Sequence, residues 1–437
     1  MVRLLSIVLC FIWGLQDVAA KELDQKKVIL KKNDTGFYRV FINDKETPIR
    51  GAGGVVQPGM LEQFKAVGGN FTRTWGIETL EEKVSGGKKY IDKAHELGIN
   101  VMAGIWLGHE RHGFNYSNQQ QLETQRKAVR EAVRKWKEHP GIVIWGLGNE
   151  MEDPQSKSGN IVVWKELEVL AKIIKEEDPN RPIMTVIAGS SPGKVKNLIK
   201  YCPTIDALGV NAYGSAGGAG ASLVSSGWSK PFAITEFGVK GFWEVPTTSW
   251  GAPYEPNSTE KARSYYATHK LVTSTNKGSE LCMGTFAFLW GWKQEKTSTW
   301  FGMYLPTMEK LPQVDAMVKA WTGKWPKNRC PKISSIDAPF LSKKVSKNET
   351  LTAEVVAIDP DGDPLKYEWT VVEESKAHSV GGDKEYVPQS YPDLTVKNRL
   401  NKGVIKAPSK SGAYRLFLTI RDGCQNAATA NIPFFVK

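Results

Sequence analysis

Apolar, β-rich runs that alternate with helical stretches are the feature that most constrains this fold. Segments with apolar residues at helical spacing, such as "LETQRKAVREAVRKWKEHP", separate most of the runs, and several end in Gly or Pro. Eight strands alternating with helices predict a (β/α)₈ TIM barrel of the α/β class. A doubly wound open sheet is the alternative. The eight runs lie at 49–54, 69–75, 99–106, 142–149, 182–187, 205–213, 231–237 and 283–290.

The chain changes character near Cys330. Helical periodicity disappears there, and "LTAEVVAIDPDGDPLKYEWTVV" alternates apolar and polar residues around an Asp-Gly turn, which is typical of a β-sandwich. Because 437 residues exceed what one core usually holds, two domains are expected. We predict a barrel with an N-terminal hairpin at 21–328 and an all-β, immunoglobulin-like sandwich at 329–437. We expect the sandwich to be an independent spacer or a surface-docking module.

The N-terminus has the pattern of a secretory signal peptide. Arg3 precedes the apolar stretch "LLSIVLCFIWGL", and the small residues of "DVAA" predict cleavage before Lys21. The apolar stretch is too short to span a bilayer comfortably, and no longer one follows. We therefore expect residues 1–20 to be removed and the protein to be secreted and soluble, without a membrane span.

Removing the signal peptide deletes Cys10 and leaves four cysteines. Their spacing contains no CxxC motif, so disulfides or buried thiols are favoured over a zinc site. Cys330 and Cys424 could meet at one end of the sandwich. Whether they form a disulfide is left open by the sequence. Three pairings are open to four cysteines.

Neither nucleic acid nor a metal is an expected partner. The formal charge of +12 comes from Lys and Arg dispersed along helical stretches such as 122–139, which indicates solvated helix faces. His109, Glu110 and His112 lack the i, i+4 histidine spacing of a zincin helix. The "DPDGD" at 359–363 would bind calcium through its aspartates, but it lacks a bidentate Glu, so a solvated turn is favoured. No cofactor is expected.

Two glutamates follow directly after buried runs of the predicted barrel. Glu150 ends the fourth run in "IVIWGLGNE", and Glu236 ends the seventh in "AITEFG". Since the carboxyl ends of parallel strands meet at the mouth of a barrel, both should face one cleft. A single Glu there would be interpreted as a surface ion pair. Two converging carboxylates are what glycoside cleavage requires, one to protonate the departing oxygen and one to attack or to activate water.

The motifs "WGLGNE" and "ITEFG" resemble the acid/base and nucleophile signatures of glycoside hydrolase clan A, most closely its family-two-type barrels. The resemblance covers about 36–325, including "GFYRVFINDKETPIRGAGG", which is similar to that group's lead-in hairpin and first strand. It implies a retaining mechanism with Glu236 as nucleophile and Glu150 as acid and then base. Such a mechanism requires carboxyl groups about 5 Å apart.

The resemblance also assigns supporting roles at the mouth. It implies that Arg73 and Tyr213 hydrogen-bond the nucleophile, and that Asn149 contacts the sugar hydroxyl next to the anomeric carbon. It implies further that Trp290 forms the apolar floor beneath the sugar.

Two further tryptophans fall near predicted strand ends, where sugar rings can stack on them. These residues, Trp106 and Trp243, are candidate substrate-binding residues.

The resemblance leads to a hypothesis about the substrate. The barrel begins near residue 49, which leaves no room for leading sandwich domains that wall off a pocket, and an open cleft is expected. A secreted clan A barrel followed by one immunoglobulin-like domain resembles endo-β-1,3-glucanases in architecture. We therefore expect an endo-β-1,3-glucanase, with transglycosylation as an alternative outcome, that binds a polysaccharide or oligosaccharide.

Other functions stay open at this point. An endo-β-mannanase and an exo-acting β-galactosidase or β-glucosidase are alternatives. A non-catalytic carbohydrate-binding protein is the alternative of another class, and it would normally lack one of the two carboxylates. The sugar, the linkage and the oligomeric state are not determined by the sequence.

Overall fold

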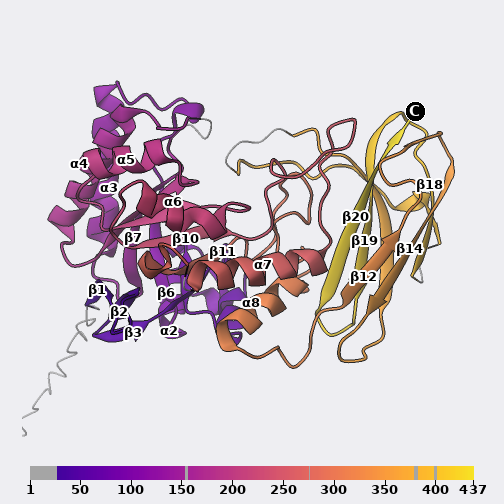
Figure 1. The fold of residues 1–437 in the computed structure, drawn as a ribbon, viewed down its shortest axis with the longest axis horizontal. Helices are drawn as coiled ribbons and strands as arrows, with labels where there is room; N and C mark the ends of the chain where they lie inside the picture. Colours follow the sequence, from indigo (N-terminus) through magenta and orange to yellow (C-terminus); the bar gives the residue numbers. More distant parts are fainter. Residues whose placement is uncertain (1–26, 153–155, 275, 378–381, 398–400) are drawn as a thin grey trace, which may run out of the picture.

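The computed structural model describes residues 27–152, 156–274, 276–377, 382–397 and 401–437. The predicted signal peptide at 1–20 and Asp153 lie outside these ranges. The described chain forms a barrel with surrounding helices and, beside it, a β-sandwich (Figure 1).

Eight parallel strands close into a barrel in the order β10-β11-β4-β5-β6-β7-β8-β9. This confirms the predicted (β/α)₈ barrel, and the open-sheet alternative is wrong. Strand β7 is buried along its whole length, which explains its continuous run of apolar residues. The barrel strands are β4 (Ile49–Gly53), β5 (Phe71–Arg73), β6 (Asn100–Ile105), β7 (Ile142–Asn149), β8 (Ile183–Ala188), β9 (Ala207–Asn211), β10 (Phe232–Phe237) and β11 (Cys282–Ala287).

The helices pack their apolar sides against the outside of the barrel and form the main hydrophobic core with it. Side-chain caps fix some of their starts: Asn257 accepts from Thr259 and Glu260 and forms a capping box with Glu260 at the start of α7. The α-helices are α1 (Met60–Ala66), α2 (Tyr90–Glu96), α3 (Gln119–Trp136), α4 (Ile161–Glu177), α5 (Pro192–Tyr201), α6 (Ala219–Ser225), α7 (Ser258–Thr273) and α8 (Pro312–Thr322). Within the described ranges, no helix combines the length and the apolar character needed to cross a membrane.

A small antiparallel sheet precedes the barrel. It contains β1 (Val28–Lys32), β2 (Tyr38–Ile42) and β3 (Lys45–Thr47) in that order. Its buried residues Val28 and Val40 share one cluster with barrel residues such as Phe71 and Met102. The small sheet therefore contributes to the packing of the barrel interior.

Two sheets form the C-terminal sandwich, as the alternation of apolar and polar residues predicts; its immunoglobulin-like character stays a prediction. One sheet has the order β12-β14-β18-β17 and the other β13-β20-β19-β15-β16. Trp369 is fully buried in the core between them. The strands are β12 (Lys332–Asp337), β13 (Lys344–Val345), β14 (Thr350–Ile358), β15 (Lys366–Glu373), β16 (Ser390–Tyr391), β17 (Thr395–Lys397), β18 (Lys402–Lys406), β19 (Gly412–Arg421) and β20 (Ala427–Val436).

The cysteines of the sandwich are not bonded to each other. Cys330 is a buried free thiol and Cys424 is an exposed one, so the considered disulfide is absent from the structure. The Sγ of Cys330 instead lies 3.7 Å from the Nζ of Lys310 and 3.3 Å from its carbonyl oxygen. The local surroundings of Cys330 are therefore a lysine and its backbone rather than a second thiol.

The "DPDGD" segment forms a turn held by its own first aspartate. The Oδ1 of Asp359 accepts from the backbone N–H groups of Asp361 and Asp363. The carboxylates of Asp361 and Asp363 accept from Arg329 and Asn328 in the chain that leads into the sandwich. This turn therefore fastens the beginning of the domain.

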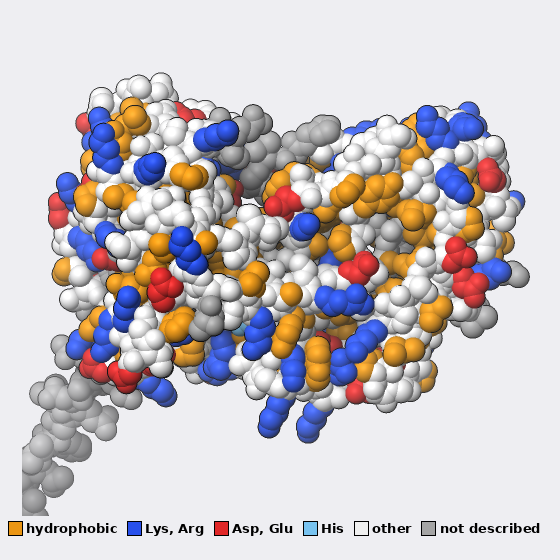
Figure 2. Space-filling model, viewed as in Figure 1, with side chains coloured by type: hydrophobic (Ala, Val, Ile, Leu, Met, Phe, Trp, Pro, Cys, Tyr) orange, Lys and Arg blue, Asp and Glu red, His pale blue; other side chains and the backbone are white. Residues whose placement is uncertain are grey.

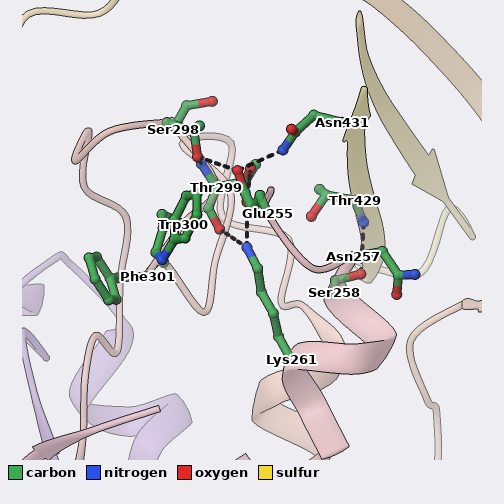
Figure 3. A network of polar contacts seen from close by, with 12 residues as sticks. Glu255, Asn257, Ser258, Lys261, Ser298, Thr299, Trp300, Phe301, Thr429 and Asn431 are labelled. Carbon is green, nitrogen blue, oxygen red and sulfur yellow. Dashed lines mark hydrogen bonds and ion pairs between the residues drawn. The ribbon is translucent and has the colours of Figure 1, made fainter. Parts of the chain in front are cut away.

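Buried polar contacts join the sandwich to the barrel, as Figure 3 shows. Glu255, in the segment after β10, pairs with Lys261 of α7, and each of these side chains is only 1% exposed. The Nδ2 of Asn431 on β20 donates to Glu255 Oε2 at 2.6 Å. The backbone N–H of Thr429 donates to Ser258 Oγ at 2.8 Å.

A second buried cluster surrounds Arg415 of β19. Its guanidinium donates to both carboxylate oxygens of Glu374, to Asn431 Oδ1 at 2.7 Å and to the carbonyl of Pro253 at 2.8 Å. The sandwich therefore has a hydrophobic core of its own and also shares buried charges with the barrel. Its role as a spacer or surface-docking module stays a prediction, and the sequence pattern of each strand does not reveal such contacts between distant segments.

We predict that Lys261→Met lowers the free energy of unfolding by about 3 kcal/mol or more, because it leaves the Glu255 carboxylate buried without its partner. Lys127→Met is the matched control: Lys127 is 77% exposed, and an exposed pair contributes at most about 1 kcal/mol. Urea unfolding followed by circular dichroism measures both variants. Equal losses in the two variants would show that the Glu255–Lys261 pair does not stabilise the interface.

Candidate active site

Glu150 lies directly after β7 in an unusual backbone conformation. Its φ is +48°, in the left-handed region that non-glycine residues rarely occupy, and Gly148 two residues earlier has φ of +74°. A Cβ atom at Gly148 would lie 2.3 Å from the Sδ of Met151, so only glycine fits there. Such conformations persist where the surrounding structure enforces them, often at functional sites.

Glu236 of β10 is 6% exposed, and its carboxylate accepts hydrogen bonds from three side chains. Trp75 Nε1 donates to Oε1 at 2.9 Å, and Tyr213 donates its hydroxyl to Oε2 at 2.9 Å. Arg73 Nη1 lies 3.4 Å from Oε1. These three donors fix the position of the Glu236 carboxylate from three sides.

The guanidinium of Arg73 is the centre of the polar cluster. Its side chain is 2% exposed; Nη1 donates to Asn211 Oδ1 at 3.1 Å and to the Thr235 carbonyl at 2.9 Å, and Nη2 donates to Asn149 Oδ1 at 2.9 Å. Burial lowers the pKa of Arg73, while the charges of Glu236 and Glu150 act in the opposite direction. Because arginine keeps its proton in proteins, the cluster retains one fixed cation.

Asn211 connects the two glutamates through Arg73. Its Nδ2 donates to Glu150 Oε1 at 2.6 Å and to Asn149 Oδ1 at 3.1 Å. Its Oδ1 accepts from Arg73 and from Thr235 Oγ1, which fixes the orientation of the amide. The structure therefore brings Glu150, Glu236, Arg73 and Asn149 into one hydrogen-bonded group.

The two glutamates have different protonation chemistry. The pKa of Glu150 is raised to about 7, first by the loss of water around its carboxyl group and second by the negative charge of Glu236, while the Asn211 hydrogen bond acts in the opposite direction. A carboxyl group with this pKa is partly protonated at neutral pH and can both donate and accept a proton. Two carboxyl groups with separated protonation behaviour are the pattern of an acid/base and nucleophile pair.

Trp290 is not part of the mouth, and its predicted role as the floor beneath the sugar is wrong. It is fully buried, with ring centroids 5.1 Å from Phe64 of α1 and 5.5 Å from Trp321 of α8. The reason is that β11 ends at Ala287, three residues before Trp290.

Phe288 is the aromatic residue that lies beside the nucleophile instead. It makes edge contacts with Trp75 at 5.9 Å and with Tyr213 at 6.0 Å between ring centroids. Phe288 follows directly after the last residue of β11. If the end of this strand had been predicted at Ala287, Phe288 would have been recognised as the aromatic residue at the mouth.

Trp106 and Trp243 are at the mouth with exposed rings. Trp106, just after β6, is 42% exposed and stacks on His109 at 4.6 Å between ring centroids. Trp243, in the segment after β10, is 58% exposed and contacts the edge of Tyr213. Since β6 and β10 are four strands apart in the eight-stranded barrel, the two rings stand on opposite sides of the mouth.

Several polar residues of these segments have structural partners, whereas neither ring nitrogen of the buried His109 has a hydrogen-bond partner. Glu152 is buried against Lys194 Nζ at 2.9 Å and joins the segment after β7 to α5. Glu110 accepts from Asn160, and His112 Nε2 lies 3.1 Å from Asp383 Oδ1, so these residues do not converge on one point. In the described chain, three potential metal ligands do meet in the sandwich, at Asp363, Asp422 and Cys424, outside this site.

Besides Phe288, sequence reasoning did not identify Asn211 or the hydrogen bond that the indole N–H of Trp75 donates to Glu236. Asn211 stands at the end of the sixth predicted strand, in "GVNAY", which was a usable signal. Trp75 was visible as an aromatic residue near a strand end, but a tryptophan that donates to a carboxylate is not distinguishable in sequence from one that packs in a core.

Part of the barrel matches the model of a known family. Residues 87–240, which include both glutamates, match the family model "Glycosyl hydrolases family 2, TIM barrel domain". No curated protein matches the chain.

Several solved structures share the fold. They include β-glucuronidase 2 of Bacteroides uniformis, covalently bound to cyclophellitol-6-carboxylate aziridine (13% identity, 94% of this chain and 48% of that chain, TM-score 0.50). The β-D-glucuronidase of Dictyoglomus thermophilum has 14% identity over 69% and 54% of the chains, with a TM-score of 0.51. The galacturonate-bound GH2 β-galacturonidase of Eisenbergiella tayi has 16% identity over 68% and 54%, with a TM-score of 0.50. This chain spans about half the length of each.

We predict that Glu236→Gln lowers the pKa of Glu150 below about 7, because it removes the negative charge that favours the protonated form. The pKa should still exceed the model-compound value of about 4.3, since burial is the larger cause. NMR titration of the glutamate carboxyl carbons measures the shift. Glu280→Gln, remote from the mouth, is the control, and an unchanged Glu150 pKa in Glu236→Gln would contradict the coupling.

Proposed function

We propose that the protein is a secreted, retaining β-glycoside hydrolase with Glu236 as nucleophile and Glu150 as acid/base. The observation that carries this proposal is the contrast between the two carboxylates. Glu236 accepts hydrogen bonds from Arg73, Trp75 and Tyr213, whereas Glu150 has its pKa raised to about 7. The secreted location rests on the N-terminal sequence pattern alone.

The geometry supports a double displacement. In the first step, Glu150 gives its proton to the departing glycosidic oxygen while Glu236 attacks the anomeric carbon and forms a glycosyl ester. In the second step, Glu150 accepts a proton from water, which attacks the anomeric carbon and releases Glu236. Asn149 supports both steps, because its Oδ1 accepts from Arg73 and Asn211, leaving the amide nitrogen to donate to a sugar hydroxyl.

For the substrate we propose a neutral polysaccharide, most specifically β-1,3-glucan cleaved internally. Two exposed rings on opposite sides of the mouth, Trp106 and Trp243, suit a sugar chain that extends beyond the cleaved bond. Lys293, whose Nζ lies 5.9 Å from the Phe288 ring centroid, is already paired with Glu295 at 2.7 Å. This pairing favours a neutral sugar over the uronic acids named for the similar solved structures.

We predict that Glu236→Ala abolishes turnover, and that azide then restores formation of a glycosyl azide of inverted configuration. In Glu150→Ala, aryl glycosides with activated leaving groups should still be attacked, since they need no proton from the enzyme. For unactivated substrates, kcat/KM of the wild type should fall as the pH rises through about 7, because Glu150 loses its proton. Turnover by Glu236→Ala without an added nucleophile would overturn the assignment.

We predict a ladder of oligosaccharides as the early products from soluble β-1,3-glucan, and products longer than an oligosaccharide substrate if transfer competes with hydrolysis. Chromatography of the first products, with mannan, galactan and an aryl β-glucuronide assayed in parallel, measures the preference. Release of monosaccharide alone would contradict internal cleavage. Preference for another member of the panel would contradict β-1,3-glucan as the substrate while leaving the retaining mechanism intact.

A further inference from the structure

A segment of the sandwich reaches the mouth of the barrel. It belongs to the connection between β15 and β16, and its residues at 382–385 contact two separate barrel segments. Asp383 accepts from His112 Nε2 at 3.1 Å and lies 3.9 Å from Arg111, both of which follow β6. The Gly382 carbonyl accepts from Lys293 Nζ at 2.7 Å, after β11. Figures 1 and 2 show the sandwich beside the barrel.

This segment contacts both ends of an arc of the rim. Strands β4 and β5 form the arc and lie between β11 and β6 in the barrel. Residues 54–59 connect β4 to α1, and residues 74–89, which include the short helix at Glu78–Glu81, connect β5 to α2. Residues 382–385 thus connect the two ends of this arc from outside the barrel.

The contacts at one end of the arc continue toward the reacting centre. Lys293, which donates to the Gly382 carbonyl, also contacts the face of Phe288. Phe288 in turn packs against Trp75 and Tyr213, which both donate to Glu236. Only two side chains, Lys293 and Phe288, therefore separate Gly382 from the donors that hold the nucleophile.

The contacts at the other end join a sugar-stacking platform. His112, the partner of Asp383, lies 5.5 Å from His109 between ring centroids, and His109 supports the exposed ring of Trp106. Asp383 and His112 are 43% and 42% exposed, so both can reach a bound chain. An aromatic platform beside polar side chains is the usual composition of a carbohydrate subsite.

We infer that residues 382–385 of the sandwich form one wall of the substrate cleft, with Asp383 as a specificity-determining residue for sugar units beyond the cleaved one. This inference rests on the proposed function. Three ion pairs lie along the wall, Asp383 with Arg111, Lys293 with Glu295 and Lys296 with Glu374, and Lys384 of the same segment is exposed. The wall thus suits a neutral polyhydroxyl chain, which hydrogen-bonds to paired groups without requiring a counter-charge.

The test compares Asp383→Ala with wild type in the full chain, on soluble β-1,3-glucan and on a single-sugar aryl β-glucoside. Loss of about one hydrogen bond and of the ordered wall should raise KM for the glucan about fivefold or more. The values of kcat and KM for the aryl glucoside should change less than about twofold, because that substrate does not reach the wall. Asp383→Asn, which still accepts a hydrogen bond from His112, should restore most of the glucan KM.

Asp393→Ala is the matched control, because Asp393 is an exposed aspartate of the same domain away from this contact. An unchanged KM for the glucan in Asp383→Ala, or equal increases in KM for both substrates, would contradict the proposal that residues 382–385 form a wall of the cleft. A wild type that attacks neither substrate would instead refute the proposed glucanase function. The two failures are therefore distinguishable.

Discussion

The ion pair between Arg73 and Glu236 is the interaction on which the site depends. Both side chains are buried, at 2% and 8% exposure, and a buried carboxylate stays ionised only when a charge and hydrogen bonds compensate for the lost water. The same guanidinium orients Asn149 and Asn211, and Asn211 holds Glu150. One cation therefore fixes Glu236, Asn149 and, through Asn211, Glu150, and the barrel supplies these groups from the ends of separate strands.

The negative charge of Glu236 is also what separates the two carboxylates. It adds to the burial that raises the pKa of Glu150 to about 7, so the anionic state of one residue favours the protonated state of the other. Formation of a glycosyl ester on Glu236 removes that charge, and the pKa of Glu150 should fall as a result. The change has the direction that the chemistry needs, because Glu150 is an acid before the ester forms and a base afterwards.

The sequence was sufficient for the barrel and for the residues that end its strands, because a buried strand and the position after it are local features. Glu150 and Glu236 follow from that logic, whereas Arg73, Asn149 and Tyr213 were assigned from the resemblance to glycoside hydrolase clan A. The prediction for Trp290 was wrong because the predicted strand ended three residues after the real end of β11. This error assigned a core residue to the site. Contacts such as Arg415 with Glu374, or Asp383 with His112, join segments far apart in sequence and leave no local pattern.

The central claim is that Glu236 becomes covalently glycosylated during turnover. A fluorinated glucosyl fluoride, which forms the glycosyl ester quickly and releases it slowly, tests this most directly. Proteolysis and mass spectrometry of the trapped enzyme should place one glycosyl group on Glu236, with no label in Glu236→Gln. A label on Glu150, or full turnover of the reagent without any covalent adduct, would contradict the account.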